Sequence, residues 1–217
     1  WLVQSTQSFL LEVLLAVGLT AVVGMLLEAT LLRTLYARDH LSQVLATFAL
    51  ILIINESVRM IWGSDLALSA PQALSGPVQL LPGLLYPSYR LVIIAVGLAI
   101  ALLLFVLVSK TRMGAWVRVG ASNRELAMAM GINIQRLFTL VFGLGAALCA
   151  VAGALLGPLL AVQVGMGESI LILAFVVIVI GGIGSVRGAL IAALLVGLVD
   201  TFGKVLLPQI SGMLVYV

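Results

Sequence analysis

The sequence predicts an all-α fold, a polytopic transmembrane bundle of about six helices. Two observations support this prediction. Of the 217 residues, 63% are hydrophobic and only 9% are charged, whereas a soluble domain has about 25% charged residues. The apolar residues also form long unbroken runs, which excludes the alternating pattern of an outer-membrane β-barrel. Because so few polar side chains cannot cover a globule, we expect membrane lipid to surround most of the chain.

Six apolar stretches define the expected helices. A span needs about 20 residues, and each stretch comes close to that length. The fifth stretch is the shortest and is interrupted by Gly181, Gly182 and Gly184. It is therefore either a full span or a re-entrant segment. The stretches cover residues 9–27, 41–62, 90–109, 137–160, 169–186 and 188–207.

The basic residues predict an orientation in the membrane. Five of the eleven Lys and Arg residues lie in segment 110–136, and the positive-inside rule places such a loop in the cytoplasm. Counting spans backwards places the loop that holds Arg33 in the cytoplasm as well, and the Pro-rich segment 63–89 outside. Counting forwards makes segment 157–168 external and Arg187 cytoplasmic. One topology therefore fits every short loop.

A short capped helix is expected inside the basic loop. Ser122 and Glu125 have the spacing of a capping box at a helix start. Gly131 stands where a left-handed residue would end that helix. A helix of about two turns that exposes Leu and Met is suited to a groove on another protein, and the alternative is a helix on the membrane surface. The candidate docking residues are Ser122, Asn123, Arg124, Glu125, Leu126, Met130 and Gly131.

Small residues form two further candidate sites. The first is a Gly-rich turn in which glycines would let two helices meet closely. Its residues are Gly181, Gly182, Gly184, Ser185 and Gly188. The second is a stripe with a four-residue repeat, which favours helix packing within the chain over a contact with a second membrane chain. Its residues are Gly145, Cys149, Gly153 and Gly157.

Several kinds of chemistry are excluded by the sequence. The chain has no Gly-x4-Gly-Lys-Ser/Thr motif, so it cannot be its own Walker-type ATPase. The single Cys149 excludes an internal disulfide, and with the single His40 it gives no metal site. The basic residues follow membrane topology, so nucleic acid is not an expected partner.

The charged residues in or near the apolar stretches lie mostly towards the ends of the predicted spans. They are Glu12, the pair Glu56 and Arg59, and the pair Asp200 and Lys204. Both pairs have the spacing of ion pairs along a helix. Structural pairing is therefore favoured over a role in a transport pathway, and the set contains no catalytic combination.

Three motifs resemble one family of transport proteins. The run 120–133, Gly-Ala-Ser-Asn-Arg-Glu-Leu-Ala-Met-Ala-Met-Gly-Ile-Asn, resembles the coupling loop of branched-chain amino-acid ABC transporter permeases of the LivH type. The run 181–190, Gly-Gly-Ile-Gly-Ser-Val-Arg-Gly-Ala-Leu, is similar to that family's Gly-rich turn, and the run 61–65, Ile-Trp-Gly-Ser-Asp, also resembles the family. Urea and short-amide permeases, and more distantly ribose-type sugar permeases, are similar at these motifs.

The resemblance implies a fold and a function. The fold would be of the ABC importer permease type, with residues 1–217 as one transmembrane domain whose N-terminal and final C-terminal helices lie outside this sequence. Segment 110–136 would be the cytoplasmic coupling loop. The chain would be a permease subunit that moves a small polar solute, a branched-chain amino acid, across the bacterial inner membrane.

The resemblance also implies partners. These are a second homologous permease, cytoplasmic ABC ATPases that use ATP and Mg, and a periplasmic solute-binding protein. The chain itself would bind no cofactor. The alternatives are a urea or short-amide permease, an ATP-independent channel or secondary carrier, and a structural membrane subunit. A carrier would show ionisable residues near the midplane and inverted repeats, and the sequence shows no such repeat.

Overall fold

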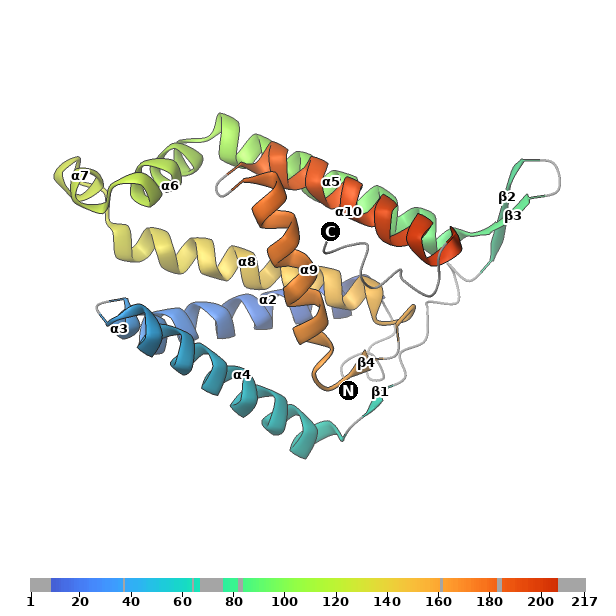
Figure 1. Cartoon of the computed structure of the whole chain (residues 1–217), viewed down its shortest axis with the longest axis horizontal. Coiled ribbons are helices and arrows are strands. Elements are labelled where there is room, and N and C mark those ends of the chain that lie inside the picture. Colours follow the sequence, from blue (N-terminus) through green and yellow to red (C-terminus); the bar gives the residue numbers. More distant parts are fainter. Residues whose placement is uncertain are drawn as a thin grey trace. The chain divides into compact units, whose positions relative to one another are not determined.

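A computed structural model describes residues 9–36, 38–63, 65–66, 76–81, 84–160, 162–182 and 185–206. This part of the chain is mainly helical (Figure 1), as the composition predicts. The helices are α2 (Phe9–Leu27), the π-helical turn η1 (Glu28–Leu32), α3 (Arg33–Leu35), α4 (His40–Trp62), α5 (Ser88–Lys110), α6 (Arg112–Ser122), α7 (Arg124–Ala129), α8 (Ile134–Leu156), α9 (Met166–Gly181) and α10 (Val186–Leu206). The short strands are β1 (Asp65–Leu66), β2 (Pro77–Leu81), β3 (Leu84–Pro87) and β4 (Val162–Gln163).

Within the described residues, five helical segments are long and apolar enough to cross a membrane. They are Leu11–Leu35, Leu41–Trp62, Ser88–Lys110, Ile134–Leu156 and Val186–Leu206. These segments overlap five of the six predicted stretches, so the chain is a multi-pass membrane protein. The remaining one, the fifth stretch at residues 169–186, forms α9, which has 16 residues. This gives about 24 Å of helix against a hydrocarbon core of about 30 Å, so α9 remains either a span or a re-entrant segment.

The first spanning segment is longer than the sequence predicts. The apolar run stops at Leu27, but α2 continues through η1 and α3 to Leu35 without leaving a helical conformation. Arg33 therefore lies in a helix and not in the predicted loop. The prediction was wrong because Glu28 and Arg33 lower the local hydropathy, whereas in the structure these two side chains lie close to each other and both bind Thr139.

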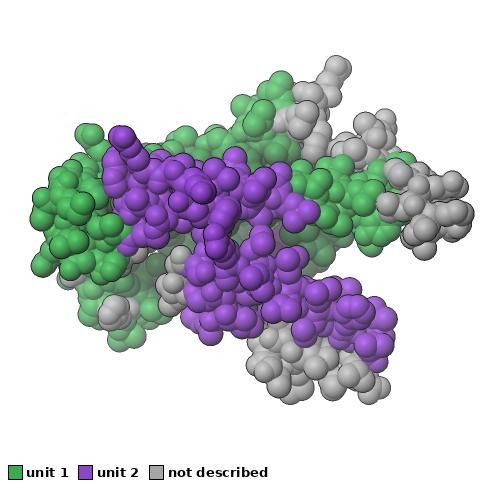
Figure 2. Space-filling view, turned by 90° about the horizontal axis from the view of Figure 1, so that it is seen from above, with its two compact units in different colours: residues 1–96, 119–164 green, residues 97–118, 165–217 purple. Residues whose placement is uncertain are grey.

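Contacts divide the chain into two compact units, coloured separately in Figure 2. Unit 1 contains residues 1–96 and 119–164, and unit 2 contains residues 97–118 and 165–217. Each unit is built around one helix pair, α2 with α8 in unit 1 and α9 with α10 in unit 2. The prediction of a single transmembrane domain stays a prediction.

The α2–α8 pair of unit 1 is close because small residues face the partner helix. A Cβ atom added to Gly24 would lie 2.6 Å from the Cβ of Ala146. A Cβ added to Gly143 would lie 2.5 Å from the Cγ of Met25. Side chains larger than glycine would therefore separate the two backbones, which is the usual reason for small residues between membrane helices.

Polar contacts hold the ends of the unit 1 helices. The hydroxyl of the buried Tyr89 at the start of α5 donates to the carbonyl of Leu155 near the end of α8, at 2.9 Å. Asp39 caps α4 by accepting from the backbone amide of Ser42 at 3.2 Å. The hydroxyl and the amide of Ser42 both donate to the carboxylate, which lowers the pKa of Asp39 from its ordinary value of 3.8.

Two strand pairs lie in the segments that the topology places outside. Strands β2 and β3 form an antiparallel hairpin. Strand β1 follows α4 and pairs with β4, which follows α8, so that Asp65 is opposite Gln163. The pairing brings together two segments that the charge pattern places on the same side of the membrane.

Candidate functional site

Helix α7 is the short helix predicted in the basic loop, but its N-cap is not the predicted one. The side chain of Asn123 accepts from the backbone amide of Leu126 at 3.0 Å. Ser122 is instead the last residue of α6. The prediction of a Ser122–Glu125 capping box was wrong by one residue, because asparagine is at least as good an N-cap as serine and α6 already includes Ser122.

The C-terminal end of α7 agrees with the prediction. Gly131 has a φ of +78°, a conformation that glycine adopts without the steric cost of a Cβ. Its amide donates to the carbonyl of Met128 at 2.9 Å, and the amide of Ile132 donates to that of Ala127 at 3.1 Å. These two bonds make a Schellman motif. Both ends of α7 therefore have their own hydrogen bonds.

Helix α7 is attached to unit 1 by one side and exposes the other. Ala127 is fully buried, whereas Leu126 is 56% exposed and Met130 is 66% exposed. Leu126 and Met130 are four residues apart and thus lie on one face of a helix. The result is a small apolar face on a helix that has two well-formed ends.

The end of α6 and the start of α8, which flank α7 in sequence, pack against each other. Asn133 caps α8 by accepting from the amide of Arg136 at 3.1 Å. Ile134 and Leu137 in the first turn of α8 are buried. A Cβ added to Gly120 in α6 would lie 3.3 Å from Ile134 and 3.4 Å from Leu137. The basic loop is therefore folded on both sides of α7, although the sequence predicted only one helix in it.

A buried charged cluster lies at the end of the first spanning segment. Glu28 is fully buried, and its carboxylate accepts a hydrogen bond from the hydroxyl of Thr139 in α8. Arg33 donates from Nη2 to the same hydroxyl at 3.0 Å, and this nitrogen lies 3.6 Å from Oε2 of Glu28. A buried charge is costly unless it has partners, so this cluster is a functional candidate in a membrane segment.

The π-helical turn explains why Glu28 and Arg33 can share one partner. In an α-helix, residues five apart point about 140° away from each other. In a π-turn the hydrogen bonds join residues five apart, so that these residues stack. Glu28 was not among the predicted site residues, because it lies one residue beyond the apolar stretch that ends at Leu27 and because α-helical periodicity does not bring it near Arg33. A Glu and an Arg at the end of an apolar run were the available signal.

The charged cluster and α7 line one cavity in unit 1. Its volume is about 270 Å³, and Glu28, Arg33, Met128 and Gln135 are among its lining residues. Met128 belongs to α7 and is 57% exposed. The cavity therefore joins the short exposed helix to the buried charges of the first spanning segment.

Comparison with known proteins identifies the family of this chain. The family model described as "Branched-chain amino acid transport system / permease component" matches residues 1–217. The chain belongs to this family. No solved structure matches the chain significantly.

Curated relatives agree with this assignment. The probable branched-chain amino acid transport permease protein LivH of Methanocaldococcus jannaschii is 30% identical over 95% of this chain and 66% of the relative. The high-affinity branched-chain amino acid transport system permease protein BraD of Pseudomonas aeruginosa is 35% identical over 56% of this chain and 40% of the relative. The fructose import permease protein FrcC of Rhizobium meliloti is 33% identical over 48% of this chain and 31% of the relative. The matches thus span from a third to two thirds of these relatives' length.

The Gly-rich turn of this permease-family chain joins α9 to α10 in unit 2. Gly182 has a φ of +83°, which favours glycine. Ser185 caps α10 by accepting from the amide of Gly188 at 3.0 Å. A Cβ on Gly181 would lie 2.6 Å from the backbone nitrogen of Ala189, and a Cβ on Gly188 would overlap the carbonyl oxygen of Gly181. Close backbone approach at this turn therefore requires glycine. Gly184 lies outside the described residues.

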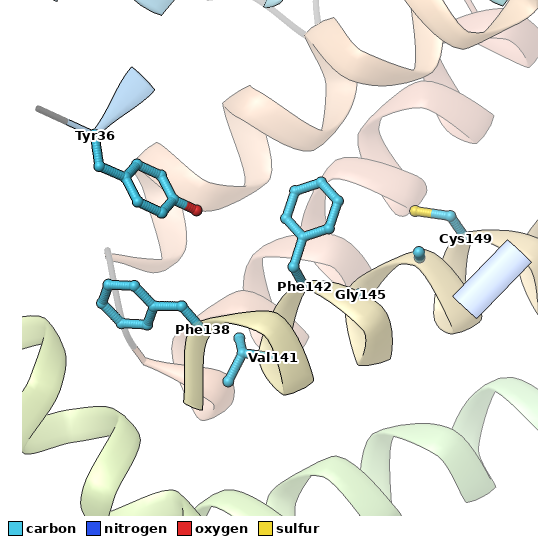
Figure 3. A pocket seen from close by; sticks show the side chains of 7 residues that line it. Tyr36, Phe138, Val141, Phe142, Gly145 and Cys149 are labelled. Atoms are coloured by element: carbon cyan, nitrogen blue, oxygen red, sulfur yellow. The ribbon is translucent and has the colours of Figure 1, made fainter. Parts of the chain in front are cut away.

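Gly145 and Gly153 of the small-residue stripe do not form the α2–α8 contact, whereas Gly157, the C-cap of α8, is buried. Among the described residues, a Cβ on Gly145 or Gly153 would meet nothing within 4 Å. Gly145 and Cys149 instead line an open groove of about 560 Å³, together with Tyr36, Phe138 and Phe142 (Figure 3). What packs against this stripe stays a prediction, both for contacts within the chain and for contacts with a second chain.

The predicted ion pairs along helices are present. The carboxylate of Glu56 lies 3.9 Å from Arg59, and that of Asp200 lies 2.6 Å from Lys204. Within the residues that the structure describes, no group of three His, Cys, Asp or Glu side chains could hold a metal ion. The prediction that this chain binds no cofactor stays a prediction.

Proposed function

We propose that this chain is the membrane-spanning permease subunit of an ATP-driven ABC importer in the bacterial inner membrane. Its membership of a transport permease family and its five span-length helices support this proposal. The proposed solute is a branched-chain amino acid. The LivH relative with this substrate class in its name aligns with 95% of this chain, whereas the fructose permease aligns with 48%.

The observation that carries the proposal is the exposed apolar face of α7. Leu126 and Met130 are more than half exposed on a helix that has both caps and one buried anchor, Ala127. For ATP-driven transport, a permease chain without a phosphate-binding loop needs ATP hydrolysis by another subunit. An amphipathic helix that enters a groove is a common way to hold such a partner. We therefore propose that α7 docks in a cytoplasmic ABC ATPase, which binds ATP and Mg.

The remaining proposed partners follow from the permease role. A second, homologous permease would complete the pathway across the membrane, and a periplasmic solute-binding protein would deliver the solute. ATP binding would move the docked α7, and the packed helices of unit 1 would carry this motion into the membrane. The other proposed docking residues are Ser122, Asn123, Arg124, Glu125 and Gly131, which position the exposed face because they form α7, cap it or directly precede it.

Replacement of Leu126 by aspartate tests the docking. Leu126→Asp should reduce co-purification of the full-length permease with its ATPase by about tenfold or more, because the contact would bury an unpaired charge. Ala115→Asp is the matched control, since it places the same charge on an exposed residue of the same basic loop that lies outside α7 and outside the candidate docking residues. Both variants should reach the membrane at the native level because neither changes a spanning segment.

Native co-purification and native uptake in Leu126→Asp would contradict the docking proposal and would favour a helix on the membrane surface. Uptake of labelled leucine by the complete transporter, with urea and fructose as competitors, tests the solute. Leucine uptake should need ATP and should resist both competitors. Inhibition by urea would favour the urea and short-amide class, and uptake without ATP would favour a channel or secondary carrier.

A further inference from the structure

The cluster of Glu28, Arg33 and Thr139 has an incomplete set of hydrogen bonds. Glu28 is fully buried, yet its Oε1 atom has no hydrogen-bond partner among the described residues, and the same is true of the buried Nε of Arg33. Buried polar atoms without partners are rare, because each costs the full desolvation free energy of that group. Within the part of the chain that the structure describes, this arrangement thus leaves one buried acceptor and one buried donor without a hydrogen-bond partner.

The hydroxyl of Thr139 is shared between two acceptors. It lies within hydrogen-bond distance of the carboxylate of Glu28 and, at 2.9 Å, of the backbone carbonyl of Gln135. A hydroxyl has one proton and can donate to only one of them at a time. Arg33 occupies its acceptor side at 3.0 Å. The hydroxyl proton of Thr139 can therefore point to Glu28 in η1 or to Gln135 in its own helix while the side chain keeps the same rotamer.

The two unsatisfied atoms complement each other. Oε1 of Glu28 is an acceptor and Nε of Arg33 is a donor. A side-on pair, with Nε bound to one carboxylate oxygen and Nη2 to the other, would satisfy both. Nη2 and Oε2 are now 3.6 Å apart, and a shortening of about 0.8 Å would bring them to charge-assisted hydrogen-bond distance. Thr139 would then donate to Gln135 alone.

The cluster lies where α7 meets the first spanning segment. Met128 of α7 lines the same cavity as Glu28 and Arg33, and so does Gln135 in the first turn of α8, which lies between Met128 and Thr139 in sequence. Helix α8 contacts both α7 and η1. A shift of α7 therefore reaches the cluster through the cavity wall or through the first turns of α8.

We infer that Glu28, Arg33 and Thr139 form a two-position joint between α7 and the first spanning segment. In the position described here, Thr139 bridges the two charges. In the other position, Arg33 and Glu28 pair directly and Thr139 of α8 no longer holds Glu28 of η1. The inference rests on the proposed docking of α7, and the three side chains act as positioning residues that contact no solute in this scheme.

Conservative pairs of variants in the full-length transporter test the joint. Thr139→Val removes the hydroxyl and keeps the shape, whereas Thr139→Ser keeps the hydroxyl. In proteoliposomes with the ATPase and the binding protein, Thr139→Val should lower the amount of leucine imported per ATP hydrolysed by about tenfold, because it removes a hydrogen bond to charged groups. Thr139→Ser should remain close to native. Co-purification with the ATPase should be native in both.

Arg33→Lys provides a second, independent variant. Lysine keeps the charge but lacks the Nε donor and the planar fork of the side-on pair. We expect it to lower import per ATP as Thr139→Val does. If Thr139→Val fails to fold, Arg33→Lys decides between the two outcomes below.

Native import per ATP in Thr139→Val or in Arg33→Lys would overturn the joint. A lower yield or melting temperature with an unchanged ratio of import to hydrolysis would also overturn it, because that pattern marks a purely structural role. Failure of the native chain to bind an ATPase would instead refute the proposed function. The two failures are therefore distinguishable in one set of measurements.

Discussion

Single glycines of this chain differ in what surrounds them. In α10, a Cβ on Gly188 would overlap the carbonyl oxygen of Gly181, whereas a Cβ on Gly197 would meet nothing within 4 Å. The sequence predicted a tight glycine turn at residues 181–188 from the cluster of glycines. The sequence could not show at which of these positions glycine is required, because the requirement arises from the backbone of the neighbouring helix and not from the surrounding sequence.

Gly188→Ala and Gly197→Ala should therefore have opposite effects. We expect Gly188→Ala to cost about 1–3 kcal/mol of stability, because the added methyl group forces α9 and α10 apart. Gly197→Ala should be neutral or should stabilise α10 by about 0.5–1 kcal/mol through helix propensity. Thermal melting of both full-length variants in the same detergent checks this. Equal melting temperatures would show that the two helices are not in close contact at Gly188.

Residue-scale prediction also failed at Glu28, for a different reason. The residue was visible in the sequence, but the predicted stretch ended one residue before it. Its partner Arg33 is brought near by the π-turn that separates the two residues, and its partner Thr139 comes from a helix more than a hundred residues later. Pattern analysis assumes one helical period and local partners, so a cluster of this kind requires the tertiary structure.

At the scale of elements, the ends of α7 depend on hydrogen bonds between residues close in sequence, and most of these could be predicted from the sequence. The glycine C-terminus was predicted correctly, and the helix Arg124–Ala129 lies within the predicted limits. Helix α6 was not predicted, because its two glycines and its valines are weak helix formers. Close contacts in the folded chain explain why glycine occupies both positions. Gly114 lies against the backbone of Val108, and Gly120 lies against Ile134.

The corrected N-cap of α7 gives a prediction about this element. Asn123→Ala should destabilise α7 by about 0.5–2 kcal/mol, since the amide of Leu126 loses its acceptor. Asn123→Asp keeps an acceptor and should preserve the helix, and Ser122→Ala should have little effect. Hydrogen exchange of the α7 amides in the purified permease measures the fraying directly. Faster exchange in Ser122→Ala than in Asn123→Ala would restore the capping box that the sequence suggested.

At the scale of the whole molecule, hydropathy predicted the spans well because the bilayer imposes one strong constraint on length and composition. Five predicted stretches coincide with helices of spanning length. The exception is α9, whose 16 residues are apolar but short. Whether α9 crosses the membrane determines on which side of the membrane the residues after it begin, so the topology of the C-terminal part depends on this one helix.

The charge pattern predicts that α9 does cross the membrane. Segment 157–168 carries little charge and was placed outside, whereas Arg187 after the Gly-rich turn was placed in the cytoplasm. Gln163 and Ser185 are exposed residues on either side of α9. With cysteine at one of these positions in a Cys149→Ser background, an impermeant maleimide added to intact cells should label position 163 and not position 185. Position 185 should react only after the membrane is opened.

Two reference positions complete the labelling experiment. Ser122→Cys in the basic loop should behave like Ser185→Cys, and Gly76→Cys before the β2–β3 hairpin should behave like Gln163→Cys. If positions 163 and 185 react from the same side, α9 is a re-entrant segment, and local thinning of the bilayer around a helix of about 24 Å is unnecessary. If position 122 reacts from outside, the positive-inside assignment fails for the whole chain, and α7 could not meet a cytoplasmic ATPase.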